Sequence, residues 1–571
     1  MNKNTSGLLL MILAIFITVH PAICETHVSG SVSGTWTVED GPYIADAALN
    51  VLQSDTLTIE PGVTVLFQGR YGLTITGILI AEGEEDDSIF FHANNHQPDT
   101  WIGLEFNSMR SSYSRLAYCS IKYAYRGIVF DGANPSVVNS SLAYHENAGL
   151  RLEESRATIT DCDVSNINGS GIAILESSRP VIQGCTISRC QNNGISVSGA
   201  SGPRIIENII RDVTDVGINL SEAENCSLRS NQIILNELQG IRINQSDDVV
   251  LLRNIIYQCG SEGAYIYRSE GITLLNNTIK ENSGTGIYVY TSSAEITSNI
   301  VDRNDQDGIF AQGANPQLAY NCVYGNDRDN YSGVQAGMGD IDEDPALDGD
   351  FIPMEGSPVI DAGDPDYDDL DGTRSDIGAR FFNQNHPPEI ISTSPEPFDE
   401  LEGDQSIVFI VYAEDPDNHP LTFTWYLNDE QVGDENSVEI LFNRDGDYVV
   451  RIVVDDGYYM GQTSYEWSFR AVGMLVPDDG RMLPGVFALS APYPNPFNST
   501  ARIELTIGRT ELVNLSVNDL NGRQILTVWN GILRPGRYGY TIDGKALPAG
   551  SYIITAQVGR EQFKRKITLI K

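Results

Sequence analysis

A Gly-apolar-x-apolar tetrad recurs through the middle of the chain. Its ten copies begin at Gly103, Gly127, Gly149, Gly171, Gly194, Gly217, Gly240, Gly263, Gly286 and, in a degenerate form, Gly308. Successive copies are 22 to 24 residues apart. A period of this length indicates repeated supersecondary units that bury their apolar faces against one another.

A second pattern, apolar-x-x-Asn-x-apolar, lies between the tetrads. Its Asn position is occupied in order by Cys119, Ser140, Cys162, Cys185, Asn208, Asn231, Asn254, Asn277, Asn299 and Asn321. Both patterns alternate apolar and variable residues, as short strands do, and neither has the 3.6-residue period of a helix. The fold class is therefore all-β, and residues 101–325 are predicted to form a right-handed parallel β-helix whose coils rise ~4.8 Å each.

The Asn column predicts a buried ladder of side chains that hydrogen-bond the turns of adjacent coils. Cysteine is a small residue that replaces Asn in this column. Seven cysteines follow Cys24, an odd number that argues against a disulfide framework. A single disulfide between Cys162 and Cys185 on neighbouring coils is an alternative.

The chain resembles the secreted β-helix proteins related to pectate lyases. Gly34–Trp36, Asp55–Gly62 and Trp101–Leu104 resemble N-terminal coils of that group, so residues 25–100 are interpreted as a cap and first coils. Residues 326–385 are interpreted as an acidic closing segment, because Ser357–Pro365 and Asp376–Ala379 resemble the end of many bacterial β-helices.

Residues 386–472 have the strand spacing of a small β-sandwich. Predicted strands cover 406–412, 421–427, 448–454 and 465–469. The sequences AEDPD at 413–417 and VDDG at 454–457 resemble cadherin-like and polycystic-kidney-disease-type Ig domains. Glu414, Asp415 and Asp417 are candidate calcium ligands, with a spacer role without metal as the alternative.

A linker at 473–490 precedes the last domain, residues 491–571. The sequences YPNPFN at 493–498, DLNGR at 519–523 and LPAGSY at 547–552, with a basic end from Lys564 to Lys571, closely resemble the C-terminal sorting domain of type IX secretion. The resemblance implies the type IX secretion machinery as a partner. It also implies a protein that is secreted or held at the outer cell surface of a Gram-negative bacterium.

The N-terminus is predicted to be an export signal, residues 1–24. Lys3 precedes an apolar run from Leu8 to Val19, and Ala22 and Cys24 are small residues at the cleavage-determining positions. We expect cleavage after Cys24, with a lipid-anchored Cys24 as the alternative. No later run reaches ~18 apolar residues, so no transmembrane segment is expected in the mature chain.

The formal charge of −41 limits which partners the chain can bind. Such a charge repels phosphate backbones and argues against nucleic-acid binding. It favours loose binding of divalent cations. Calcium is the expected cofactor, with candidate ligands that crowd into one acidic stretch: Asp364, Asp366, Asp368, Asp371 and Asp376. A solvated acidic turn is the alternative.

Catalytic residues are not evident. The paired Asp motifs of polygalacturonases are absent, and Asp247-Asp248 is the one aspartate pair inside the repeat. A lyase would need a basic side chain beside a carboxylate cluster. Five cations occur singly and are interpreted as members of surface ion pairs: Lys122, Arg126, Arg151, Arg242 and Lys280.

One outward face of the repeat is rich in aromatic residues. Positions two and four after the tetrad glycine are predicted to point outward, and on four successive coils they hold Arg242, Tyr265, Tyr267, Tyr288, Tyr290 and Phe310. Contiguous exposed aromatic side chains mark interaction sites and suit sugar rings. We therefore predict polysaccharide binding on this face. A polysaccharide lyase or glycoside hydrolase and a structural or adhesive surface protein remain alternatives.

Overall fold

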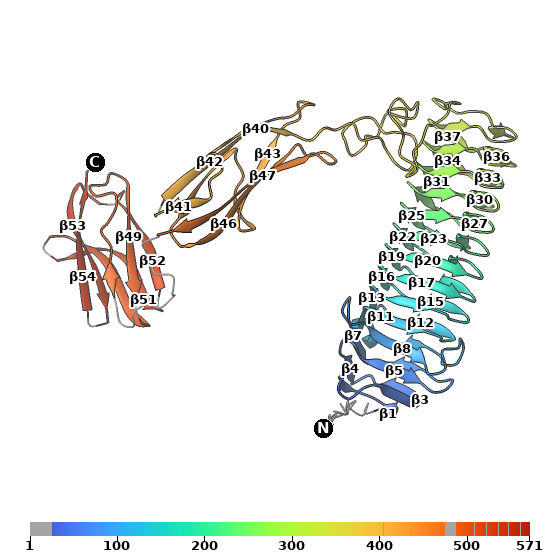
Figure 1. Cartoon of the computed structure of the whole chain (residues 1–571), viewed down its shortest axis with the longest axis horizontal. Helices are drawn as coiled ribbons and strands as arrows, with labels where there is room; N and C mark the ends of the chain where they lie inside the picture. The colour runs from blue at the N-terminus through green and yellow to red at the C-terminus, as the bar shows by residue number, and fades with distance from the viewer. Residues whose placement is uncertain are drawn as a thin grey trace, which may run out of the picture. The chain divides into compact units, whose positions relative to one another are not determined.

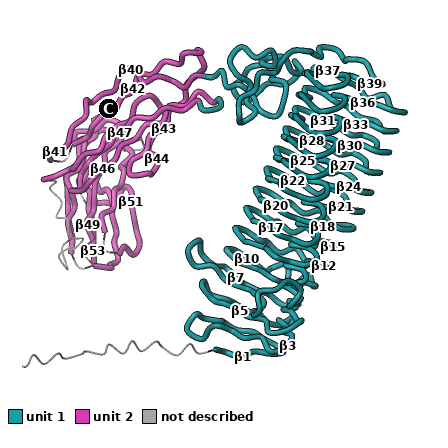
Figure 2. The backbone as a smooth tube through the Cα atoms, turned by 45° about the vertical axis from the view of Figure 1, so that its right-hand side comes forward, with its two compact units in different colours: residues 1–385, 458–460 teal, residues 386–457, 461–571 magenta. Residues whose placement is uncertain are grey.

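The computed structural model describes residues 25–403, 405–473, 487–507, 509–520, 522–534, 536–545, 547–559 and 561–570. They form two compact units, coloured separately in Figure 2: residues up to Asn385 with 458–460, and the described residues of 386–457 and 461–570. The predicted export signal, 1–24, and residues 474–486 of the predicted linker lie outside the described residues.

Strands β1 to β39 of the first unit pair in parallel and stack coil upon coil (Figure 1). The β-helix has three faces. A 13-stranded sheet forms one of them, and a 26-stranded sheet forms the other two as two stacks of strands. These two stacks are joined at β3 (Tyr43–Val51), which pairs with the first strand of each stack and with β1 (Thr26–Ser31). One 3₁₀ turn, η1 (Arg110–Tyr113), interrupts the strands. The all-β, parallel β-helical architecture predicted from the repeat is confirmed.

The bounds follow the repeat. The first stack, which begins each coil at the tetrad, contains β6 (Leu73–Ile75), β9 (Leu104–Phe106), β12 (Arg126–Asp131), β15 (Ala148–Glu153), β18 (Ser170–Ile174), β21 (Ile195–Ser198), β24 (Ile218–Ser221), β27 (Ile241–Asn244), β30 (Ala264–Tyr267), β33 (Ile287–Tyr290), β36 (Ile309–Gln312) and β39 (Tyr331–Ser332). The 13-stranded sheet contains β2 (Gly34–Trp36), β4 (Thr56–Ile59), β7 (Ile78–Glu82), β10 (Arg115–Ala117), β13 (Ser136–Val138), β16 (Thr158–Thr160), β19 (Val181–Gln183), β22 (Arg204–Ile206), β25 (Ser227–Arg229), β28 (Val250–Leu252), β31 (Ile272–Leu275), β34 (Ala294–Thr297) and β37 (Gln317–Ala319). The remaining stack contains β5 (Thr64–Phe67), β8 (Ile89–Ala93), β11 (Cys119–Lys122), β14 (Ser141–Ala143), β17 (Asp163–Ile167), β20 (Thr186–Cys190), β23 (Ile209–Arg211), β26 (Gln232–Ile234), β29 (Ile255–Tyr257), β32 (Thr278–Lys280), β35 (Ile300–Asp302) and β38 (Cys322–Tyr324).

The tetrad glycines allow the coils to approach closely. A Cβ atom added at Gly217 would lie 2.5 Å from Ile233 Cγ2 and 2.6 Å from the carbonyl oxygen of Gly240, one coil away. The apolar residues that follow each glycine, such as Ile241 and Ile243, are fully buried. Each tetrad thus begins with a glycine, where no side chain could fit between the coils, and continues as a short strand with two inward-pointing apolar side chains.

The predicted Asn ladder is present and buried. Asn254 Oδ1 accepts the backbone N–H of Asn231 at 3.0 Å, and its Nδ2 donates to the Leu228 carbonyl at 2.9 Å. The same pattern repeats from Asn208 to Asn321. The last backbone N–H, that of Asn321, donates to Asp340 Oδ1 at 2.8 Å, so a carboxylate ends the ladder.

A second ladder was not predicted. Asn282, Asn304 and Asn326 lie at the turn before each tetrad, and Asn282 Nδ2 donates to Asn304 Oδ1 at 2.9 Å. Cys190 and Cys259 share this column, whereas Cys119, Cys162 and Cys185 occupy the first ladder. All seven cysteines of the described residues are buried free thiols, including the Cys162 and Cys185 pair.

The acidic closing segment packs on the last coils. Val359 and Ile377 form a small buried cluster with Ile300 and Cys322. The backbone N–H of Gly378 donates to the Ser298 carbonyl at 2.9 Å. The segment covers outward positions of β35 and β38 that would otherwise leave apolar side chains exposed.

The second unit begins with two sheets whose strands pair antiparallel, except that β41 pairs with β47 in parallel. One contains β40 (Glu389–Ser394), β42 (Gln405–Glu414) and β45 (Ser437–Phe442), and the other contains β41 (Glu400–Glu402), β47 (Gln462–Val472), β46 (Gly446–Asp455), β43 (Thr422–Leu427) and β44 (Glu430–Gly433). Phe409, Trp425 and Trp467 are buried between them. The two sheets fit the predicted Ig-like sandwich.

The C-terminal residues form another two-sheet body with its own core. Its sheets are β48 (Ala488–Leu489), β49 (Thr500–Ile507) and β52 (Gly536–Asp543), and β51 (Gln524–Leu533), β50 (Glu511–Asn518), β53 (Gly550–Val558) and β54 (Glu561–Leu569). Leu505, Leu515 and Ile554 are fully buried in this core. Within the described residues, no helix has the length and apolar character needed to cross a membrane.

Candidate functional site

Four neighbouring strands carry the aromatic residues singled out in the sequence. Strands β27, β30, β33 and β36 pair in register, so that Arg242, Tyr265, Tyr288 and Phe310 form one outward row. Asn244, Tyr267, Tyr290 and Gln312 form the row beside it. Residues between them, such as Ile266 and Val289, point inward and are buried. The structure therefore brings all six predicted residues onto one face.

The rings stack on one another rather than lying flat on the sheet. The ring centroids of Tyr265 and Tyr288 are 5.1 Å apart, and those of Tyr288 and Phe310 are 4.9 Å apart. Tyr267 and Tyr290 stack at 5.2 Å in the second row. We call these five side chains the aromatic ladder. Because neighbouring rings face each other, Tyr288 has a ring on both sides, and the inner ring faces are unavailable to a ligand.

Tyr265 and Tyr267, the first two side chains of the aromatic ladder, border a shallow depression. Its volume is about 300 Å³, and it is lined by Asn219, Ser221, Arg242, Asn244, Tyr265 and Tyr267. These residues come from three successive coils, so the depression lies on the side of Tyr265 away from Tyr288. Two tyrosine rings, a guanidinium group and three small polar side chains meet here.

Two tyrosines of the aromatic ladder stay protonated at neutral pH. Burial raises the pKa of Tyr265, and the neighbouring Tyr288 and Glu262 raise it further. Burial and Glu262 also raise the pKa of Tyr288. Both phenols therefore remain hydrogen-bond donors at neutral pH. Arg242 donates from Nε to Asn219 Oδ1 at 2.8 Å, which holds the guanidinium at the edge of the depression.

The five candidate calcium ligands of the closing segment do not share one orientation. Asp376 is buried, and its two oxygens accept the backbone N–H groups of Asp361 and Phe382, each at 2.7 Å. Asp371 is also buried and accepts N–H groups from Thr373 and Gln384. Backbone donors thus occupy these two carboxylates.

The other three candidates lie nearer the surface. Asp366 and Asp368 are exposed, and Asp364 Oδ1 accepts the backbone N–H of Asp366 at 3.1 Å. The neighbouring Asp369 is buried, and its Oδ1 lies 3.2 Å from Arg253 of the β-helix. The segment is held by carboxylate-to-backbone hydrogen bonds, and calcium binding there stays a prediction.

Two of these buried carboxyl groups predict a pH dependence. Burial raises the pKa of Asp376 to about 7 and that of Asp369 to about 6. Both groups bind a proton more tightly in the folded chain than in the unfolded chain, where the pKa is ~4. Their contribution to the free energy of unfolding is complete below that pH and is lost as the pH rises through about 6 to 7.

We therefore expect the closing segment to open more readily at neutral pH than in mild acid. Hydrogen exchange of the Asp361 and Phe382 amides, corrected for intrinsic rates, measures this opening. Asp376→Asn should remove much of the pH dependence, and Asp366→Asn, at an exposed position, is the matched control. Greater protection at neutral pH than in mild acid would contradict the assignment.

Two of the cations considered as catalytic bases are engaged in ion pairs. Lys280 Nζ lies 2.5 Å from Asp302 Oδ2 and 3.0 Å from Glu281 Oε1. Arg151 lies 3.0 Å from Glu153. Asp247 and Asp248 lie between β27 and β28, at a turn. Both cations are ion-paired as predicted, but the Lys280–Asp302 pair is largely buried rather than at the surface.

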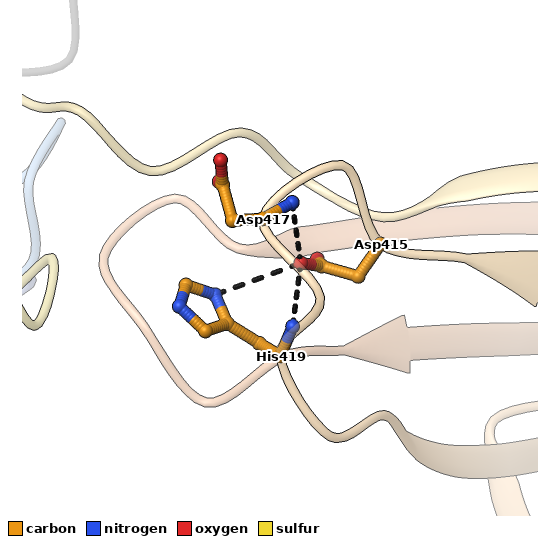
Figure 3. A group of neighbouring side chains, drawn as sticks. All are labelled: Asp415, Asp417 and His419. Carbon is orange, nitrogen blue, oxygen red and sulfur yellow. Dashed lines mark hydrogen bonds and ion pairs between the residues drawn. The ribbon is translucent and has the colours of Figure 1, made fainter.

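A different trio meets in the loop after β42. Asp415, Asp417 and His419 are close neighbours there, whereas Glu414, a candidate from the sequence, is not among them (Figure 3). Sequence reasoning did not include His419. The available signal was a histidine two residues beyond the second aspartate in a short loop.

Family models match two parts of the chain. Residues 148–298 and 273–340 match the right handed beta helix region, and residues 491–571 match the secretion system C-terminal sorting domain. The chain contains a right-handed β-helix and a type IX sorting domain. The handedness and the sorting domain predicted from the sequence are thereby confirmed.

Comparisons with individual proteins add little to this. No curated protein sequence matches the chain. Among solved structures, the periplasmic alginate epimerase AlgG is 15% identical over 52% of this chain and 76% of its own, with a TM-score of 0.32. The A-module of a mannuronan C-5 epimerase from Azotobacter vinelandii is 13% identical over 51% of this chain and 91% of its own, with a TM-score of 0.38.

A third solved structure covers more of the chain. The enzymatically active domain of tailspike protein 2 from bacteriophage CBA120 is 10% identical over 90% of this chain and 78% of its own, with a TM-score of 0.30. Similarity at these identities and TM-scores carries no argument about a shared activity.

Proposed function

We propose that this protein is exported through the type IX route and binds a polysaccharide at the outer cell surface. The sorting domain at 491–571 supports the route. The depression beside the aromatic ladder supports the binding, because Tyr265 offers a ring there and Arg242, Asn219 and Asn244 offer hydrogen-bonding groups. Sugars present apolar ring faces with polar rims, and such a pairing of an aromatic ring with polar side chains suits both.

The stacking and the depression together favour a contact at Tyr265 and Tyr267, the end of the aromatic ladder next to Arg242. Since Tyr288 is covered on both ring faces, a sugar ring would meet Tyr265 from the side of Arg242. The remaining rungs act as a support that fixes the orientation of Tyr265 and Tyr267. The phenol hydroxyls along the ladder edge can donate to a glycan that continues along the rod.

We expect Tyr265→Ala to weaken glycan binding about tenfold or more, because it removes the ring and its stacking energy. Arg242→Ala should weaken binding to acidic glycans more than to neutral ones. Binding is measured on a glycan array and then by titration with the best ligand. Tyr113→Ala is the matched control, since Tyr113 is an exposed tyrosine of the same β-helix away from the ladder.

Two outcomes would overturn the proposal. Wild-type protein that binds no glycan would leave a structural or adhesive role. Equal binding by the Tyr265 and Tyr113 variants would move the site elsewhere. Unsaturated products or new reducing ends from uronic-acid polymers would instead identify a lyase or a hydrolase.

A further inference from the structure

The loop between β42 and β43 gathers two aspartates and a histidine (Figure 3). One potential ligand atom from each of Asp415, Asp417 and His419 lies within 4.8 Å of the other two. In the part of the chain that the structure describes, no other group of three His, Cys, Asp or Glu side chains comes this close.

Asp415 is held rigidly at the centre of the loop. Its Oδ1 accepts the backbone N–H groups of Asp417 and His419, both at 2.9 Å. The ring Nδ1 of His419 lies 3.6 Å from the same oxygen. Figure 3 shows these three interactions converging on one carboxylate oxygen.

The second carboxylate oxygen of Asp415 lacks a partner, which suggests a binding position for a cation. The Asp415 side chain is only 2% exposed, so water does not solvate its Oδ2, and this oxygen has no hydrogen-bond partner in the protein either. Leaving a carboxylate oxygen buried and unpaired costs free energy. A cation bound at this oxygen would remove that cost.

Asp417 is oriented by a residue outside the loop. Its carboxylate accepts the backbone N–H of His386 at 2.7 Å and lies 3.3 Å from His386 Nδ1. Outer contacts of this kind fix the direction of a metal-binding carboxylate. Each oxygen retains a free lone pair for a metal.

We propose that this loop binds a divalent transition-metal cation through Asp415 Oδ2, the Asp417 carboxylate and the His419 imidazole. Three protein ligands of mixed oxygen and nitrogen type suit Zn²⁺, with water in the remaining position. Calcium prefers six to eight oxygen ligands, so the imidazole disfavours it.

The site is independent of the glycan proposal, because all of its residues lie in the second unit. Its effect follows from its position. The metal would tie the β42–β43 loop to His386, where this unit begins, through the Asp417 carboxylate. Metal binding then stabilises the folded Ig-like body by mass action.

The test is a calorimetric titration of Zn²⁺ into the full chain, with excess Ca²⁺ present to occupy scattered carboxylates. We expect one Zn²⁺ site per chain that Ca²⁺ does not displace. His419→Gln should weaken it by more than about tenfold. Asp415→Asn should do the same, because asparagine keeps the Oδ1 acceptor for both loop amides and loses the charge. His27→Gln is the matched control, since His27 forms an exposed pair with Asp46 at 2.8 Å.

Substitution with Co²⁺ provides a second readout. Its visible absorption should report a bound nitrogen in the wild type and lose that feature in His419→Gln. The fluorescence of Trp425 and Trp467, both buried in this body, shows whether each variant is folded. Failure of the wild type to bind Zn²⁺ under excess Ca²⁺ would overturn the proposal. So would unchanged affinity and absorption in His419→Gln.

Discussion

Gly217→Ala is expected to destabilise the β-helix by about 3 kcal/mol, as overpacking in a tight interior does. The new Cβ would lie 2.5 Å from Ile233 Cγ2, 2.6 Å from the Gly240 carbonyl and 2.8 Å from Asn236 Nδ2. Ile233 Cγ2 and Asn236 Nδ2 belong to buried side chains, and the Gly240 oxygen belongs to the backbone of the next coil. None can retreat without moving a coil, so the strain spreads to the neighbouring rungs.

The matched control is Gly349→Ala. Gly349 has nothing within 4 Å of its added Cβ, and its φ is not in the left-handed region. Hydrogen exchange resolved along the chain measures the loss, because a stacked repeat need not unfold in two states. Equal protection of β24, β26 and β27 in both variants would contradict this account of the tetrad.

Asn254→Leu should cost about 3–5 kcal/mol, since four buried groups lose a hydrogen-bond partner worth roughly 1–3 kcal/mol each. They are the Asn231 backbone N–H, the Asn231 side-chain amide, the Leu228 carbonyl and the side-chain oxygen of Asn277. No water replaces them, because Asn254 and Asn231 are fully buried. Leucine also matches the shape of asparagine only approximately.

Asn254→Ser is the informative comparison. Ser140 occupies the same ladder position in an earlier coil, where its Oγ accepts the Cys119 N–H at 3.1 Å. The serine variant should therefore lose less stability than the leucine variant. Chemical denaturation with exchange measurements on coils β25 to β29 compares the two. A leucine variant as stable as the serine variant would show that packing, rather than hydrogen bonding, governs the ladder.

Much of the fold was predictable because its order is local and repeated. The spacing of the tetrads sets one coil, and alternation within each tetrad sets which side chains face inward. The outward positions of Tyr265, Tyr267, Tyr288 and Tyr290 followed from the same alternation and are confirmed in register.

The second ladder was harder to find because its column is less uniform. Asn236, Asn282, Asn304 and Asn326 recur with the coil period, but His145, Cys190 and Val213 precede them at equivalent turns. Chemically unlike residues fill this buried column: the imidazole of His145 and the amide of Asn236 accept a backbone N–H, whereas Val213 fills the volume with an apolar side chain.

For the candidate sites too, some properties follow from the sequence and others from the tertiary structure. The sequence alone determined that Tyr265 to Phe310 share an outward face, that Asp364 to Asp376 form an acidic stretch and that the C-terminus is a sorting domain. These properties depend on spacing and composition.

Only the tertiary structure decided how those groups are used. The coil spacing places successive rings near 5 Å apart, so they stack face to face and cover the inner ring faces, and the depression adjoins Tyr265 and Tyr267 at one end of the stack. The fold also turns Asp376 toward backbone donors and Asp415 toward His419. Side-chain direction and burial arise from contacts between coils and strands, and a linear pattern of residue types does not specify them.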